Sequence, residues 1–243
     1  MNELTRIARR LGRETGAMRF AEPVAHIYNP LDYAWRPHRA YLEKFGAAAP
    51  REVLLVGMNP GPWGMAQTGV PFGDVAAVRD WMGVEAKVNK PADEHHKVVI
   101  KGFASNRREV SGQRVWAWAA ERFGSADDFF DRFMVMNYCP LCFLEAGGRN
   151  RTPDKLSREE RDELYAYCDR ALRDTIEVLR PRFVIGIGKF AETRIRSAAV
   201  GTQVVIGSVL HPSPASPMAN RGWAPQMDAG LRALGVSVPE PLV

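Results

Sequence analysis

Four short runs of apolar residues predict four strands, at residues 53–57, 133–137, 183–188 and 203–210, and the first two are expected to be buried. The first run, residues 53–56, is continuously apolar rather than alternating, which is typical of a strand that is covered on both faces. Segments with helical periodicity separate the runs, and the longest extends from residue 157 to residue 179. Repeated strand–helix units of this kind predict an α/β fold with a central, four-stranded and mainly parallel sheet.

Weaker patterns predict the elements around this sheet. We expect a helix over residues 1–20, an extended covering segment over 21–37 and a glycine-rich loop over 145–156. Asp74 and Ser111 each precede a stretch with helical periodicity, and both are residue types that cap helices. We therefore expect them to begin two further helices.

Three of the predicted strands lead into a hydrogen-bonding side chain. Asn59 follows the first strand, Asn137 ends the second and His211 follows the fourth. In a parallel sheet such positions share one edge, where ligand sites are commonly built. Each residue also has a structural alternative, since an Asn can tie down a turn and a His can be packed in a core. If the functional interpretation holds, the three side chains converge on one site.

The loop after the first strand, residues 58–74, combines glycines and prolines with large apolar side chains. Trp63, Met65 and Phe72 supply apolar or aromatic surface, and the glycines permit close approach of the backbone to a ligand. This composition fits a flat, neutral, hydrogen-bonding ring such as a nucleobase. It equally fits a connector whose aromatic residues fill the core.

Composition and charge limit the classes of protein that need to be considered. The chain has 243 residues with no linker-like stretch, so we expect a single domain over residues 1–243. The formal net charge of +5 permits a polyanionic partner without establishing one. Three cysteines are too few for a four-thiolate metal site, and we expect no metal and no cofactor. Neither a signal peptide nor a membrane-spanning run is visible, so we expect an intracellular protein without a membrane partner.

Several motifs, read together, point to one family. They are GMNPGPWGMAQTGVPFG at residues 57–73, EVSG at 109–112, NYCPL at 137–141, GRN-x-TP at 148–153, HPSP at 211–214 and NRGW at 220–223. All of them resemble the single-strand-selective monofunctional uracil-DNA glycosylases, a branch of the uracil-DNA glycosylase superfamily. The resemblance extends from about Glu22 to Trp223. It implies a three-layer α/β/α fold and hydrolysis of the N-glycosidic bond of a damaged base.

The resemblance also implies roles for individual residues. Asn59 looks like the residue that holds the attacking water, and His211 like the group that stabilises the leaving base. Phe72 resembles the ring that stacks on the flipped base, and Asn137 the amide that reads its edge. The pocket would be shaped by Met58, Gly61 and Met65. DNA contacts are expected from two segments: Gly148, Arg149, Asn150, Arg151 and Thr152, and then Ser213, Pro214, Ala215, Ser216, Asn220 and Arg221.

The chemistry of base excision agrees with these residue types. A base inside a duplex must be flipped out before it can be reached. Breaking its glycosidic bond leaves positive charge on the sugar and negative charge on the base, so stabilising both charges is the main task. Asn59 is no strong base, but it can position a water that attacks an oxocarbenium ion. The Asn137 amide can pair with the N–H and carbonyl of uracil, whereas cytosine lacks that N–H.

We therefore expect a monofunctional DNA glycosylase that initiates base excision repair on single- and double-stranded DNA. Uracil is the expected substrate, with xanthine and other deaminated or oxidised bases as further candidates. We expect a monomer in the bacterial cytoplasm, associated with the nucleoid through its substrate. Two positions depart from the family: Trp63 is an aromatic variant, and Ala215 stands where vertebrate members carry Arg, which weakens the expectation of strong duplex penetration.

Two alternatives stay open at this stage. The first is a damage-binding protein that has lost catalysis, and the presence of both Asn59 and His211 argues against it. The second is an N-glycosidase that acts on free nucleosides or nucleotides. This second alternative is disfavoured by the basic loop residues Arg149, Arg151 and Arg221, because a small substrate needs no contact with a phosphate backbone.

Overall fold

The computed structural model describes residues 2–47 and 49–242 and confirms the α/β architecture with its central four-stranded sheet. All four strands are parallel, in the order β3 (Phe133–Asn137), β2 (Val53–Gly57), β6 (Phe183–Ile187) and β7 (Val205–Val209). The middle strands β2 and β6 are buried along their whole length, which explains their continuous apolar sequences. Gly57 pairs with Asn137, so β2 and β3 end side by side.

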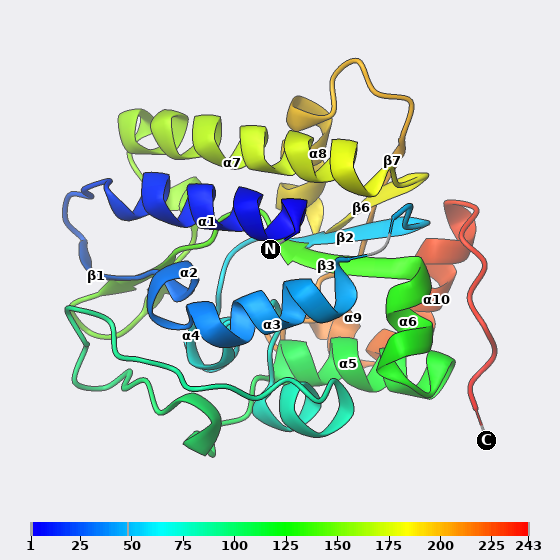
Figure 1. Cartoon of the computed structure of the whole chain (residues 1–243), viewed down its shortest axis with the longest axis horizontal. Helices are drawn as coiled ribbons and strands as arrows, with labels where there is room; N and C mark the ends of the chain where they lie inside the picture. Colours follow the sequence, from blue (N-terminus) through cyan, green and yellow to red (C-terminus); the bar gives the residue numbers. More distant parts are fainter. Residues whose placement is uncertain (1, 48, 243) are drawn as a thin grey trace.

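Helices cover both faces of this sheet and give the expected three layers (Figure 1). One face carries α7 (Arg158–Leu179) and α8 (Lys189–Ala198), and the other carries α5 (Val110–Phe123), α6 (Ala126–Arg132) and α10 (Trp223–Ala233). The predicted N-terminal helix is α1 (Glu3–Gly16), which packs against α7, while α3 (Trp35–Phe45) packs against α6. Three short helices are α2 (Pro30–Tyr33), α4 (Met65–Thr68) and α9 (Pro217–Asn220).

A second, antiparallel sheet lies beside the first and was not indicated by the sequence patterns. Its order is β1 (Val24–Tyr28), β4 (Cys142–Glu145) and β5 (Asn150–Arg151). The expectation of a loop over residues 145–156 is therefore wrong in part, because β4 and β5 form a hairpin there. The extended covering segment expected over residues 21–37 is also wrong in part, because it contains strand β1 and helix α2. Tyr28 pairs with Cys142, which lies far away in the chain, so the residues around Tyr28 show no local hydrophobic periodicity that would predict a strand.

The expected helix start after Asp74 is confirmed, since helical structure begins at Val75, whereas the predicted cap at Ser111 is wrong in detail. Helix α5 is capped by Glu109, whose carboxylate accepts a hydrogen bond from the N–H of Ser111 at 3.0 Å, so Ser111 lies inside the helix. The Asp74 carboxylate instead accepts the N–H of Glu109 at 3.3 Å, and the segment that follows it contains a π-helical turn, Ala77–Trp81. These contacts fix the start of α5 against the loop that follows β2.

Two further features of the fold concern membranes and thiols. Within residues 2–47 and 49–242, no helix is both long and apolar enough to span a bilayer. Cys139, Cys142 and Cys168 are buried free thiols.

Candidate active site

A cavity of about 400 Å³ opens at the carboxyl ends of the central strands. Asn59, Asn137 and His211 all line it, although they belong to segments far apart in the sequence. The structure thus brings together the three side chains that follow or end β2, β3 and β7. This position is the edge of a parallel sheet at which ligand sites are commonly built.

The structure gathers some of the predicted site residues at this cavity and leaves others outside. Predicted residues that line it are Met58, Asn59, Gly61, Met65, Phe72, Asn137, Asn150, Thr152, His211 and Ser213. The described lining also includes Pro62, Gly64, Glu109 and Ser111, which were not predicted. The predicted residues that do not line it are Gly148, Arg149, Arg151, Pro214, Ala215, Ser216, Asn220 and Arg221.

The amide of Asn59 is oriented by the protein. Its Nδ2 donates a hydrogen bond to the carbonyl of Leu141 at 3.1 Å. Because Nδ2 is held in this way, the Oδ1 atom is the part of the amide that remains to accept a proton donor. A water molecule in the cavity is such a donor, so the geometry suits a water-holding role.

Asn137 and the ring of Phe72 meet over Gly57. A Cβ atom built on Gly57 would lie 2.4 Å from Oδ1 of Asn137 and 2.7 Å from the Phe72 ring. Only glycine at this position leaves room for both groups. The Asn137 Nδ2 contacts the sulfur of Met65 at 3.3 Å, which fixes the amide from its other side. The result is an aromatic face next to a buried, oriented amide.

The backbone at Phe72 adopts an uncommon conformation, with φ of +53°. A non-glycine residue with positive φ is disfavoured and persists where surrounding contacts over-determine it. The Phe72 carbonyl accepts the indole N–H of Trp116 at 3.0 Å and the N–H of Asp74 at 2.8 Å. Gly112 packs against the same carbonyl, since a Cβ there would approach it to 2.0 Å. These contacts hold the Phe72 ring in place at the cavity.

His211 lies across the cavity from Phe72, with the ring centroids 6.4 Å apart and the planes tilted by 47°. Its Nδ1 accepts the backbone N–H of Ser213 at 3.1 Å. Burial lowers the pKa of His211 below its usual value of 6.5. The ring is therefore neutral at pH 7, and its proton resides on Nε2.

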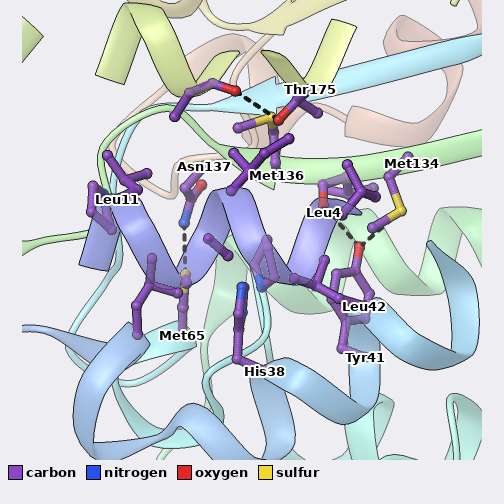
Figure 2. Close-up of a pocket in the computed structure, with 17 residues that line it drawn as sticks. Leu4, Leu11, His38, Tyr41, Leu42, Met65, Met134, Met136, Asn137 and Thr175 are labelled. Carbon is purple, nitrogen blue, oxygen red and sulfur yellow. Dashed lines mark hydrogen bonds between the residues drawn. The ribbon is translucent and has the colours of Figure 1, made fainter. Parts of the chain in front are cut away.

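A second cavity, of about 60 Å³, lies behind the wall that Asn137 and Met65 form (Figure 2). These two residues line both cavities. Figure 2 shows the Asn137 amide directed at the Met65 sulfur, with Leu11 of α1 nearby. The other lining is mainly apolar, and the buried His38 belongs to it. The part of the larger cavity's wall that Asn137 and Met65 form is therefore backed by a small void rather than by solid core.

Charged residues of the two predicted DNA-contacting segments have different surroundings. Arg151 donates to the carbonyl of Lys155 and pairs with Glu145 at 2.9 Å, so its guanidinium holds the hairpin together. Arg149 and Arg221 are exposed and form no ion pair with the described residues. Arg149 and Arg221 therefore remain available to bind an external anion.

Comparisons with known proteins decide the family. The model of the Uracil DNA glycosylase superfamily matches residues 43–228. A protein from Rattus norvegicus named "Single-strand selective monofunctional uracil-DNA glycosylase" is 46% identical over 229 residues, which cover 93% of this chain and 82% of that protein. The chain belongs to the uracil DNA glycosylase superfamily.

A second relative and a solved structure are also similar to this chain. A relative from Mus musculus named "Single-strand selective monofunctional uracil DNA glycosylase" is also 46% identical, over 93% of this chain and 82% of that protein. The crystal structure of wild-type Pedobacter heparinus SMUG2 aligns with a TM-score of 0.65 at 18% identity, over 94% of this chain and 97% of that chain. That structure shows the shared fold.

Sequence reasoning missed Arg114, a residue of α5 that anchors the loop after His211. Its guanidinium donates to the carbonyl of Pro212 at 3.0 Å and to Oδ1 of Asn220 at 2.8 Å. The loop that it holds presents an exposed apolar side chain, Met218, which is 58% exposed. No local signal marks Arg114, because its partners lie about a hundred residues away along the chain.

Sequence reasoning also missed Glu109 as a residue of this cavity, although its motif was noticed. Glu109 lines the cavity while it caps α5. Burial raises the pKa of its carboxyl group, and the nearby Asp74 adds to the effect, while hydrogen bonds from Ser111 and Gly112 oppose it. Among the described residues, no group of three His, Cys, Asp or Glu side chains is arranged to hold a metal ion.

Proposed function

We propose that this chain is a monofunctional DNA glycosylase that hydrolyses the N-glycosidic bond of uracil in DNA and so initiates base excision repair. The observation that carries the proposal is the meeting of Asn59, Asn137 and His211 around one cavity, beside the ring of Phe72. These groups match the three needs of base excision: a positioned water, an edge-reading amide and a donor for the departing base.

Recognition begins when the flipped uracil stacks on Phe72. The Asn137 amide then lies at the ring edge, where its oxygen accepts the uracil N3–H and its nitrogen donates to a ring carbonyl. Cytosine presents an acceptor at that ring nitrogen and leaves the amide oxygen without a donor. A site with a buried, unpaired polar group rejects the wrong base strongly.

Bond cleavage moves an electron pair from the glycosidic bond onto the base. The Nε2–H of neutral His211 donates a hydrogen bond to the uracil oxygen on which this charge collects. A fixed donor in a buried cavity needs no reorganisation at the moment of reaction. The water held by Asn59 then forms its bond to the sugar C1′, which completes the hydrolysis.

The two flanking segments supply a path for the DNA strand. Arg149 and Arg221 are exposed cations suited to phosphates, and backbone contacts of this kind position the strand without reading its sequence. Pro214, Ala215 and Met218 are exposed on the loop after His211. Apolar side chains of this kind can fill the gap that a flipped nucleotide leaves in the stack.

The function is tested by measuring free base released in a single turnover from matched oligonucleotides. Uracil would be placed in a single strand and opposite guanine and adenine, with xanthine and hypoxanthine in parallel. Release of uracil supports the proposal and ranks the contexts. Release of xanthine with little uracil would keep the chemistry and change the specificity, whereas no release from any substrate would overturn it.

A nucleoside N-glycosidase is the competing function, and salt dependence separates the two. Binding to a phosphate backbone weakens steeply as salt rises, because bound counterions are released on association. Affinity for a short uracil-containing strand should therefore fall from 50 to 200 mM salt. Affinity insensitive to salt, with faster turnover of free deoxyuridine, would favour the small substrate.

We also propose that the protein acts as a monomer on the DNA of a bacterial cytoplasm. Light scattering of the purified protein should give a mass close to 27.1 kDa. A stable dimer would contradict the monomer.

A further inference from the structure

One carboxylate lines the cavity. Among the residues described there, Glu109 is the only acid and His211 the only other titratable side chain. Asn59 positions a water but cannot take its proton, because a neutral amide is far too weak a base. Hydrolysis nevertheless releases one proton from the attacking water. The described site therefore contains one group chemically suited to receive it.

The Glu109 carboxylate is held from one side. Its Oε1 accepts the N–H of Ser111 at 3.0 Å in the first turn of α5, a 14-residue helix. Its Oε2 lies over the loop that follows β2, since a Cβ atom built on Gly61 would be only 2.7 Å from it. A Cβ on Gly64 would similarly approach Glu109 Cγ to 2.9 Å. The two glycines thus make room for the carboxylate directly beside the Asn59 segment.

The charged groups around Glu109 leave it without a cationic partner. The Asp74 carboxylate accepts the Glu109 N–H, and His211 is neutral across the cavity. The Arg108 guanidinium lies against the side-chain amide of Gln113, and Arg114 is held by the loop after His211. Among the described residues, no ion pair neutralises Glu109.

An unpaired acid is unfavourable in a site for DNA until the reaction begins. A carboxylate repels the phosphates of a bound strand, which weakens binding of the substrate. The same carboxylate attracts the positive charge that develops at the sugar C1′ as the base departs. An interaction that is repulsive in the ground state and attractive in the transition state accelerates the chemical step.

We propose that Glu109 is a further catalytic residue, which faces the cationic sugar and accepts the proton of the attacking water. In this step the C1′–N bond breaks and its electron pair leaves with the base. The water oxygen then bonds to C1′, and its released proton passes to Oε2 of Glu109. This assignment rests on the proposed glycosylase function and adds to it the proton acceptor that Asn59 cannot be.

The test compares Glu109→Gln with Glu121→Gln, a control that removes an exposed acid from the same helix. Glutamine preserves the acceptor for Ser111 and removes the charge. The single-turnover rate should fall about 100-fold, the size expected for loss of an acid–base group. Affinity for a non-cleavable uracil analogue in DNA should be unchanged or tighter, since a repulsive charge is gone.

The pH profile separates catalysis from structure. The wild-type rate should fall at acidic pH as Glu109 is protonated, and the Gln variant should lack this limb. The Glu109→Asp variant keeps the charge and should keep the decrease in rate at acidic pH. This second variant tests the proposal even if the Gln variant folds poorly. The assignment would be overturned if Glu109→Gln bound DNA more weakly and still lost rate at acidic pH. It would also be overturned if Glu109→Gln kept the wild-type rate.

The experiment also distinguishes this proposal from the proposed glycosylase function on which it rests. If the wild-type protein releases no base, the glycosylase function fails and the role of Glu109 fails with it. If the wild type is active while Glu109→Gln keeps its rate, only the role of Glu109 fails.

Discussion

His211 accepts a hydrogen bond at Nδ1 from the backbone N–H of Ser213, at 3.1 Å. An amide N–H can only donate, so Nδ1 carries no proton while this bond exists. The loop after His211 therefore sets the tautomer of the histidine. The cavity receives a neutral N–H donor at Nε2 whose orientation is fixed before the substrate arrives.

We predict that nitrogen NMR of the folded protein at pH 7 will show His211 with a proton on Nε2 and none on Nδ1. Burial lowers the pKa of this ring, so acidification through that pKa should protonate Nδ1 and break its bond to Ser213. A His211→Gln variant assigns the signals. A ring protonated on Nδ1 at pH 7 would contradict the donor role.

Removal of the Arg114 side chain should affect duplex substrates more than single strands. Arg114 joins Pro212 to Asn220 and so holds the loop that carries Met218. A looser loop is a poorer wedge, and we expect Arg114→Ala to slow release of uracil from duplexes about tenfold, which is near 1.4 kcal/mol. Arg6→Ala, on the exposed face of α1, is the matched control. Equal slowing on both substrates would contradict this account.

The protein should release the base without cutting the strand. Strand cleavage by a glycosylase needs an amine that forms a Schiff base with the sugar. Of the described residues that line the cavity, none is a lysine. Products should therefore carry an intact abasic site that alkali cleaves afterwards. A covalent enzyme–DNA adduct trapped by borohydride would show that an amine reaches C1′.

His38 should make the folded state sensitive to acid. It is buried, with Nδ1 2.7 Å from the carbonyl of Gly69, and burial lowers its pKa from 6.5 to about 4. The unfolded chain takes up this proton near pH 6.5 and the folded protein does not, so stability is complete above pH 6.5 and declines as pH falls toward 4. The loss is at most about 3 kcal/mol.

Urea unfolding at pH 7 and pH 4.5 checks the prediction for His38. His38→Gln keeps an N–H donor for Gly69 but does not titrate, so its free energy of unfolding should fall less between the two pH values. The difference between wild type and variant isolates His38 from the other titrating groups. Identical losses in the two proteins would show that this histidine is not responsible.

The parts of the fold that the sequence predicts are those specified by local patterns. The strands β2 and β6 are continuous apolar runs because both of their faces are buried. Helix α7 begins at a capping box in which Ser157 and Glu160 satisfy each other's backbone N–H groups. The strand-end positions of Asn59 and His211 follow from the same strands, which is why their convergence could be anticipated.

The parts that could not be predicted depend on contacts between distant segments. Strand β1 is a strand because Tyr28 pairs with Cys142, and neither segment carries a strong period. Glu109 reaches the cavity because Asp74, far earlier in the chain, fixes the start of α5. Arg151 looked free for DNA, but its position on β5 places it against Glu145. Residue types alone do not encode these partners.

The central claim is tested most directly by single-turnover release of uracil from a single-stranded oligonucleotide by wild type, Asn59→Ala and His211→Ala. The account predicts rapid release by the wild type and a loss of about 100-fold or more in each folded variant, from lost positioning and lost stabilisation of the leaving base. Thermal unfolding of each variant verifies that it is folded. Unchanged rates in folded variants would contradict the roles assigned to both residues.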